Sequence, residues 1–179
     1  MAFRSRYLPH VHEIGHPLFI TFRLHGSLHR GRYFAEGEID SGKAFAIMDR
    51  LLDSERFGPL YLKMPTIAEI VSEALRRRAG RDYDLHAWVL MANHVHLLLT
   101  PRIDFPQLMQ RIKGVTARQA NLILHLTGTR FRQHESYDRL VRGPEEFVRI
   151  HRYIIMNSVR AGIVQDPAEY RWSSEWGKL

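Results

Sequence analysis

Hydrophobic and polar residues follow one another along this chain in patterns that predict both strands and helices. Aromatic and β-branched residues between turn-forming residues predict a strand over residues 18–24. Residues 84–100 are the most strand-like stretch, and Ala92-Asn93 in its middle predicts a tight turn between two antiparallel strands. Residues 130–142 indicate a loop with a short strand.

The remaining apolar residues recur at helical spacing, and capping residues mark where the helices begin. Thr66-Ile-Ala-Glu69 and Thr116-Ala-Arg-Gln119 both have the form of a capping box. The predicted helices begin near Asp40, Thr66, Asp104, Thr116 and Pro144. The last of these is expected to be long and to end before Gly162. Strand, helices, hairpin and helices in this order predict an α+β fold with an antiparallel sheet.

Length and composition fit one globular domain over residues 1–179, with residues 1–16 as an irregular arm. The chain has 179 residues, of which 45% are hydrophobic and 25% charged. It contains no apolar run of about 18 residues and no evident signal peptide, so we expect no membrane partner. There is no cysteine, which excludes disulfides, thiolate metal ligands and a cysteine nucleophile. A cytoplasmic, nucleoid-associated location is the expectation.

The charge of the chain points to a polyanionic partner. The formal net charge is +7, and residues 101–179 hold 13 Lys and Arg against 8 Asp and Glu. Arginine dominates this second half, and its planar guanidinium can bind two phosphate oxygens at once. Nucleic acid is therefore the first candidate, although a basic surface without a ligand would give the same composition.

His94-Val95-His96 is the strongest candidate for a metal site. Within a strand, the two imidazoles point to the same face, about 7 Å apart along the backbone, while Val95 faces the core. His10-Val11-His12 has the same spacing, but Pro9 and Gly15 predict irregular backbone there, which does not align the two rings. We therefore favour the pair in the strand, with two surface histidines as the alternative.

The last predicted helix carries Tyr153, with Asn157 one turn further on the same face. A helical projection places Tyr153 near Arg149 and Arg160 and away from the main apolar stripe, which includes Val148 and Ile154. A phenol becomes a nucleophile when a nearby cation favours its deprotonation. Attack on a phosphodiester would then leave a phosphotyrosine and a free 3′-hydroxyl. An ordinary half-exposed tyrosine is the alternative.

Several short motifs, in order, resemble those of one protein family. They are Phe19-Ile-Thr-Phe-Arg-Leu-His-Gly26, Met91-Ala-Asn-His-Val-His-Leu97, Lys113-Gly-Val-Thr-Ala-Arg118, Glu135-Ser-Tyr-Asp138, Tyr153-Ile-Ile-Met-Asn157 and Trp172-Ser-Ser174. Together they resemble the REP-associated tyrosine transposases, relatives of the IS200/IS605 transposases within the HUH single-strand nucleases. The resemblance runs from about Leu8 to Ser174. The family usually has proline where Ala92 and Ser158 stand, which concerns backbone geometry and not reacting groups.

This resemblance implies a fold, a site and a substrate. The fold would be a ferredoxin-like α/β sandwich whose central antiparallel sheet carries the histidine pair. His94 and His96 would bind Mg²⁺ or Mn²⁺ with Asn157 as third ligand, and Tyr153 would be the nucleophile. Tyr137 and Tyr170 lack an asparagine four residues on. The partner would be single-stranded DNA, typically palindromic hairpins, and the protein a monomer or homodimer.

Basic residues interleaved with aromatic ones suit single-stranded DNA, because phosphates meet cations while bases stack. The predicted DNA-binding residues are Arg111, Lys113, Arg118, Arg130, Arg132, Arg142, Arg149 and Arg160. Two other functions stay open at this point. One is a non-catalytic protein that binds DNA or RNA hairpins with the same fold. The other is a metal-dependent hydrolase that uses water as its nucleophile.

Overall fold

A four-stranded antiparallel sheet forms the centre of the molecule. The computed structural model describes residues 13–28, 41–133 and 136–178. The strands are β1 (Leu18–Arg23), β2 (Tyr83–Leu90), β3 (His94–Pro101) and β4 (Tyr137–Leu140), and they lie in the order β2-β3-β1-β4. This order, with helices between β1 and β2 and between β3 and β4, is that of the ferredoxin-like fold. The predicted fold class is therefore confirmed.

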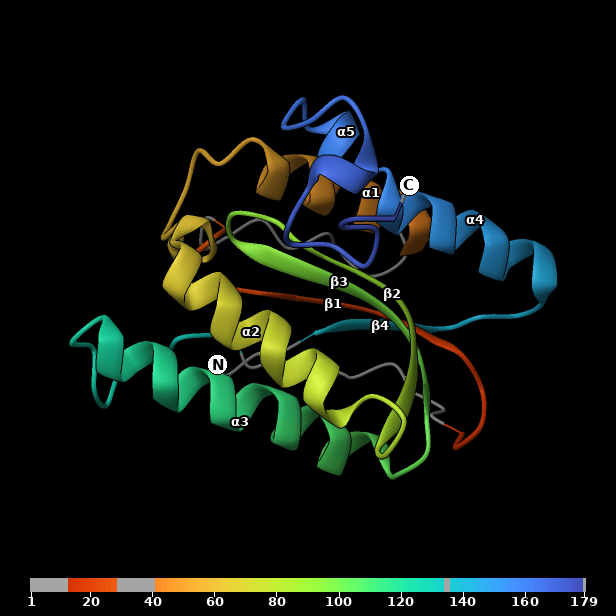
Figure 1. The fold of residues 1–179 in the computed structure, drawn as a ribbon, viewed down its shortest axis with the longest axis horizontal. Helices are drawn as coiled ribbons and strands as arrows, with labels where there is room; N and C mark the ends of the chain where they lie inside the picture. The colour runs from red at the N-terminus through yellow and green to blue at the C-terminus, as the bar shows by residue number, and fades with distance from the viewer. Residues whose placement is uncertain (1–12, 29–40, 134–135, 179) are drawn as a thin grey trace, which may run out of the picture.

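Helices cover both faces of the sheet (Figure 1). They are α1 (Ser41–Asp53), α2 (Pro65–Arg78), α3 (Phe105–Ile123), α4 (Pro144–Ile155) and α5 (Asn157–Arg160), with 3₁₀ turns at Tyr61–Lys63 and Pro167–Glu169. Helices α2 and α3 lie side by side on one face, while α1, α4 and α5 lie on the other. Among the described residues, no helix combines the length and the apolar character needed to cross a bilayer.

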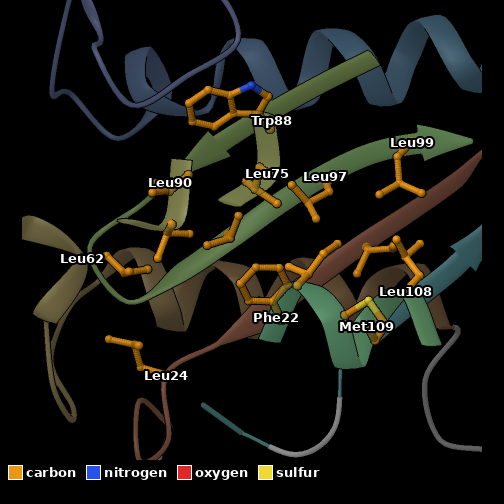
Figure 2. Packing of buried hydrophobic residues seen from close by; sticks show 14 of the residues in the cluster. Phe22, Leu24, Leu62, Leu75, Trp88, Leu90, Leu97, Leu99, Leu108 and Met109 are labelled. Atoms are coloured by element: carbon orange, nitrogen blue, oxygen red, sulfur yellow. The ribbon is translucent and has the colours of Figure 1, made fainter. Parts of the chain in front are cut away.

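The main core lies between the sheet and the pair α2 and α3. Alternate residues of β3, namely Val95, Leu97 and Leu99, point into this core and are fully buried. They meet Leu75 of α2 and Leu108 of α3. Figure 2 shows Leu75, Leu97, Leu99 and Leu108 among the clustered side chains of this core. Because one face of β3 is fixed by this packing, the residues between, including His94 and His96, are directed to the opposite face.

The second face carries a smaller core together with polar groups. Phe19, Val89 and Leu98 of the sheet pack against Phe45 of α1 and against α4. The residues after α5 then return to the sheet, where the amide of Leu90 donates to the carbonyl of Trp172 (2.8 Å). This tail pairs with the outer edge of β2, which satisfies backbone groups that an edge strand would otherwise expose.

Three sequence-based helix boundaries are wrong. Helix α2 begins at Pro65, whose fixed φ suits the first turn, so Thr66 does not act as the N-cap. Helix α3 runs without interruption through Thr116, whose hydroxyl donates to the carbonyl of Ile112 (2.8 Å) and does not cap a new helix. The predicted final helix is broken at Met156, which separates α4 from α5.

The predicted irregular arm falls mostly outside the described residues, and so does the pair His10 and His12. Of the arm, residues 13–16 are described, and they form a turn in which the amide of His16 donates to the carbonyl of Glu13 (3.2 Å).

Candidate metal centre and nucleophile

The two histidines of β3 are fully buried on the face that α1 and α4 cover. His94 and His96 are both 0% exposed, and their Nε2 atoms lie 3.1 Å apart. Two ligands in adjacent positions around one ion, each about 2.1 Å from it, lie about 3 Å apart. The side chains thus already have the separation that a shared cation requires. The predicted pairing of their rings on one face of a strand is confirmed.

Hydrogen bonds at Nδ1 orient both rings. The side-chain amide of Asn93 donates to the carbonyl of Leu52 (3.0 Å), so its Oδ1 is the atom that accepts from Nδ1 of His94 (2.8 Å). On the neighbouring strand, Oγ1 of Thr21 lies 2.7 Å from Nδ1 of His96. A proton on Nδ1 leaves the Nε2 lone pair of His94 free for a metal ion.

Helix α1 contributes a carboxylate that the sequence analysis missed. Oδ1 of Asp49 lies 3.0 Å from Nε2 of His96 and 3.6 Å from Nε2 of His94. This oxygen is buried but accepts no hydrogen bond from the described residues. Close approach without a hydrogen bond is typical of atoms that surround a common ion. The signal in the sequence was a charged residue within the apolar stripe of a predicted helix, between Phe45 and Leu52.

The electrostatics of the cluster favour ligands in the metal-binding protonation state. Burial and the neighbouring His96 lower the pKa of His94 to about 3, so its ring is neutral at pH 7. Burial alone would raise the pKa of Asp49, but His96, His94 and Arg160 outweigh it and bring that pKa below its usual value. A neutral imidazole and an ionised carboxylate are the forms that bind cations.

A second carboxylate, that of Asp53, lies one turn further along α1. Its Oδ1 is 3.7 Å from Nε2 of His94 and is also buried without a hydrogen bond in the described part of the chain. Burial, and then the nearby charge of Asp49, raise the pKa of Asp53 to about 6. The two acids therefore differ, since Asp49 is held ionised and Asp53 titrates close to neutrality.

Tyr153 reaches this cluster from α4. Its hydroxyl donates a hydrogen bond to Oδ2 of Asp49, and its ring lies 5.6 Å from that of His96. The guanidinium of Arg160 lies over the tyrosine ring, 4.8 Å from its centre. Tyr153, Arg160 and the histidines belong to one chain, so no exchange of helices is needed to bring them together.

The predicted orientation of Tyr153 away from the apolar stripe is wrong. Its half-buried ring packs 6.1 Å from the rings of both Phe19 and Phe45, whereas Val148 is 65% exposed. The buried face of α4 takes in Tyr153 as well as the predicted apolar residues Phe147 and Ile154, because the sheet presents polar groups as well as apolar ones to this helix. Helical spacing alone cannot locate such a partly polar contact surface.

Asn157 is almost fully buried at the first position of α5, with 1% exposure. Its Oδ1 accepts no hydrogen bond from the described residues. A buried carbonyl oxygen without a donor carries a desolvation cost that a bound cation would remove. Asp49, His94 and His96 present ligand atoms within 4.8 Å of one another, and two imidazoles with a carboxylate form a donor set that accepts Mn²⁺ or Mg²⁺. The role of Asn157 as a further ligand stays a prediction.

The other tyrosines considered above have different surroundings. The hydroxyl of Tyr170 donates to the backbone carbonyl of Leu90 (2.7 Å), and burial raises its pKa to about 12. The ring of Tyr137 packs against that of Phe45, with centres 4.6 Å apart. The hydroxyl of Tyr153, in contrast to that of Tyr170, donates to a member of the histidine cluster, since Asp49 lies beside both imidazoles.

The predicted DNA-binding residues divide between the two faces of the sheet. Arg149 and Arg160 are exposed on the side of Tyr153, and Arg142 is exposed just before α4. Arg111, Lys113 and Arg118 lie on α3, behind the sheet as seen from the histidines. Arg130 is exposed beyond the end of α3.

Several of these residues are engaged within the protein, among them Arg149, which pairs with Glu146 (3.7 Å). Arg111 pairs with Asp82 (3.0 Å). Arg132 is only 7% exposed, and its guanidinium lies 4.3 Å from the centre of the Phe22 ring. The DNA contacts predicted for the eight basic residues therefore stay predictions.

The fold and the paired histidines are those expected above for a single-strand nuclease of the HUH class. The model of the family described as IS200-like transposases matches residues 64–155, more than half of the chain. The chain therefore belongs to the IS200-like transposase family.

The fold is also that of a solved structure. The structure of a REP-associated tyrosine transposase bound to a REP hairpin shares it with a TM-score of 0.59 and 19% sequence identity. That comparison covers 97% of this chain and 82% of the other. A crystal structure of a proposed transposase from Deinococcus radiodurans R1 is 17% identical over 86% of this chain and 95% of that one, but its TM-score is 0.32 and no conclusion rests on it. No curated protein matches the sequence.

Proposed function

We propose that this IS200-like transposase cleaves and rejoins single-stranded DNA through attack of Tyr153 on a phosphodiester, with a short palindromic hairpin as its substrate. The observation that carries the proposal is the hydrogen bond from the Tyr153 hydroxyl to Asp49. The other oxygen of the same carboxylate lies 3.0 Å from Nε2 of His96. One side chain thus connects the nucleophile to the candidate metal ligands.

The proposed cleavage step forms one bond and breaks one. The Tyr153 oxygen attacks the phosphorus atom, and its proton passes to the carboxylate of Asp49. The bond between phosphorus and the 3′-oxygen breaks, which leaves a 5′-phosphotyrosine and a strand whose 3′-oxygen takes up a proton. Rejoining is the reverse, with a 3′-hydroxyl attacking the phosphotyrosine. Because a free phenol has a pKa of about 10, an adjacent acceptor is needed at neutral pH.

His94, His96, Asp49 and Asn157 are the residues that would hold a divalent cation, Mg²⁺ or Mn²⁺. When bound, the ion would act as a Lewis acid that polarises the scissile phosphate and offsets its charge. The chain's own contribution is to fix the ligands. Asn93 and Thr21 orient the two imidazoles, and the packing of Val95 anchors the strand between them.

The substrate is proposed from the charge of the chain and from its structural neighbour. Arg160, Arg149 and Arg142 provide exposed cations on the side of the molecule that carries Tyr153. They are the first proposed contacts for the DNA strand that enters the site. The neighbour with a TM-score of 0.59 was solved with a REP hairpin, which supports a hairpin of that kind as the substrate class.

The test is covalent capture. Hairpin oligonucleotides with single-stranded flanks, labelled at the 3′ end, are incubated with the protein and Mn²⁺, and the products are separated on a denaturing gel. The proposal predicts a labelled protein adduct that is lost with EDTA and in Tyr153→Phe. Tyr170→Phe is the matched control, since that hydroxyl bonds to the backbone carbonyl of Leu90 and not to a side chain of the histidine cluster, and it is expected to keep the adduct.

The same gel distinguishes the two other functions. Binding of the hairpin without any adduct would indicate a non-catalytic hairpin-binding protein. Cleavage that survives Tyr153→Phe, with no adduct in either protein, would indicate a hydrolase that uses water. Either result would overturn the proposed role of Tyr153.

A further inference from the structure

A second group of cations and aromatic rings lies at the outer edge of β2, where the residues after α5 return to the sheet. The amide of Ser174 donates to the carbonyl of Trp88 (2.9 Å), and its Oγ accepts from the Trp88 amide (3.2 Å). The guanidinium of Arg171 reaches Glu69 of α2 (3.0 Å). Residues 171–178, which we call the tail segment, are therefore held beside both β2 and α2.

A pocket of about 300 Å³ opens between the tail segment, β2 and α2. Its lining combines cations, aromatic rings and a hydroxyl, and it includes Arg76, His86, Arg171, Ser174, Trp176 and Lys178. Among the described residues, no carboxylate belongs to this lining. The volume lies at the lower end of the range for small-ligand sites, roughly 300–1,000 Å³, which suits a single nucleotide.

Trp176 is the most exposed of the three tryptophans, with 54% of its surface open to solvent. Trp88 is only 6% exposed, and Trp172 is partly buried with the guanidinium of Arg171 over its ring, 4.7 Å from the centre. An indole in the wall of a pocket offers a flat apolar face on which any base can stack. A stacked base would cover apolar surface that otherwise stays in water.

The cations of the pocket exceed the acids that pair with them. Arg76 and Arg171 share one carboxylate, that of Glu69, at 3.0 Å each, and Lys178 pairs with Glu175 (3.0 Å). All three cationic side chains are more than half exposed, with 56%, 61% and 63% of their surface accessible. Ion pairs this exposed contribute little to stability, so a phosphate can replace a carboxylate as the partner.

We infer that this pocket binds an unpaired nucleotide of the DNA substrate, with its base stacked on Trp176 and its phosphate beside Arg171 and Lys178. A base can stack on a side chain only where it is free of its own helix, so the single-stranded flank fits and the paired stem does not. The inference rests on the proposed function for its DNA substrate and not for the cleavage step.

The pocket is separate from the candidate metal centre but lies at the nearer edge of the sheet. Ser173 of the tail segment pairs with Val89 of β2, and Val89 is the partner of His96 on β3. Two strand spacings of about 4.8 Å thus separate the tail backbone from that of His96. A flank of several nucleotides, each adding about 3.4 Å when stacked, is long enough to occupy both sites.

Hairpin binding in EDTA tests the stacking contact without cleavage. Fluorescence anisotropy compares labelled hairpins with and without single-stranded flanks. Trp176→Ala is expected to weaken binding of the flanked hairpin by about tenfold and to leave the flankless hairpin unchanged, whereas Trp176→Phe keeps most of the affinity because it keeps a ring. Equal affinities of wild type and Trp176→Ala for the flanked hairpin would overturn the inference. An equal loss for both DNAs would place the stem there and overturn it too.

The salt dependence of the same binding tests the phosphate contact. Removing one phosphate contact with a single strand lowers the slope of log K against log salt by about 0.7, which is the change expected for Arg171→Gln and for Lys178→Gln. Arg102→Gln is the matched control, because Arg102 is also exposed, pairs with the surface carboxylate of Asp84 and does not line the pocket. An unchanged slope in both pocket variants would contradict the contact.

Failure of this inference differs from failure of the proposed function. In Mn²⁺, Trp176→Ala is expected to raise the KM for adduct formation and leave kcat unchanged, since the pocket is lined by neither His94, His96 nor Tyr153. A lower kcat with an unchanged KM would overturn the assignment of Trp176 to a separate site. The absence of adducts in wild type would overturn the role of Tyr153 and leave the binding measurements in EDTA to decide on the pocket.

Discussion

Asn93 and His94 are adjacent in sequence, and a hydrogen bond joins their side chains, with Oδ1 of Asn93 lying 2.8 Å from Nδ1 of His94. The amide nitrogen of Asn93 also donates to the carbonyl of Leu52 near the end of α1. One side chain therefore fixes the tautomer of a proposed metal ligand and connects it to the helix that carries Asp49 and Asp53.

Asn93→Ala is expected to weaken Mn²⁺ binding by about tenfold to a hundredfold, because the histidine loses the group that orients it. Calorimetric titration of the purified protein with Mn²⁺ measures the effect. Asn121→Ala on α3 is the matched control, since its amide donates to the carbonyl of Thr129 and not to the site. Equal affinities in wild type and Asn93→Ala would contradict the role given to Asn93.

Asp49→Asn is expected to remove most of the stabilisation that Mn²⁺ gives to the folded protein. A cation that binds only the folded state raises Tm with concentration, and the carboxylate supplies the negative charge of the ligand cluster. The measurement is a thermal melt with and without Mn²⁺. The adduct rate is expected to fall by about a hundredfold as well, since Tyr153 loses its ionised acceptor.

Asp84→Asn controls for the loss of a carboxylate elsewhere, because Asp84 pairs with Arg102 at the surface. This variant should keep the full Mn²⁺ shift in Tm. A Mn²⁺ shift that persists in Asp49→Asn would remove Asp49 from the ligand set.

Arg160→Ala is expected to slow adduct formation by about tenfold, because a cation over a partly buried aromatic ring stabilises negative charge near it. Arg149→Ala removes a similar side chain that is 71% exposed and pairs with Glu146, and it should change the rate much less. Single-turnover kinetics with saturating hairpin separate this effect from DNA binding. Equal rates for the two variants would show that the position over Tyr153 has no special role.

The lowered pKa of Lys113 predicts that the free energy of unfolding depends on pH. Burial, and then the nearby charge of Arg132, lower its pKa to about 8 from its ordinary 10.5. The folded state therefore holds this proton less tightly than the unfolded state, and the resulting destabilisation is present below about pH 8 and disappears as the pH rises toward 10.5. Relative to Lys113→Met, wild type should gain stability between pH 7 and pH 10 in urea unfolding. A constant difference between the two proteins would contradict the shift.

Arg132→Met is expected to stabilise the protein by about 1–3 kcal/mol, because both terminal nitrogens of this buried guanidinium lack hydrogen-bond partners in the described part of the chain. Its contact with the Phe22 ring offsets only part of that cost. Urea unfolding measures the change. Hairpin affinity measured on the same variant tests the predicted contact of Arg132 with DNA. That contact predicts a clear loss of hairpin binding in Arg132→Met.

The sequence located the histidine pair because strand geometry is local. In β3 the alternation of His94, Val95 and His96 fixes which side chains share a face, whatever the rest of the fold does. The hairpin turn at Ala92-Asn93 is local for the same reason. The order of strands and helices was likewise sufficient to predict an α+β fold with an antiparallel sheet, while the ferredoxin-like arrangement came from the family resemblance. Helix boundaries were less secure. Thr116 shows one reason, since a hydroxyl can bond to a helical carbonyl as readily as it caps, and Thr66 shows another, since Pro65 begins the helix before it.

Asp49 and the orientation of Tyr153 were decided by the tertiary structure alone. These residues are 104 positions apart, and nothing local relates α1 to α4. Only the packing of both helices on the same face of the sheet brings the carboxylate, the phenol and the imidazoles together. Sequence periodicity indicates which residues of an element are buried. It does not indicate which buried polar groups contact one another, because those contacts depend on how separate elements pack together.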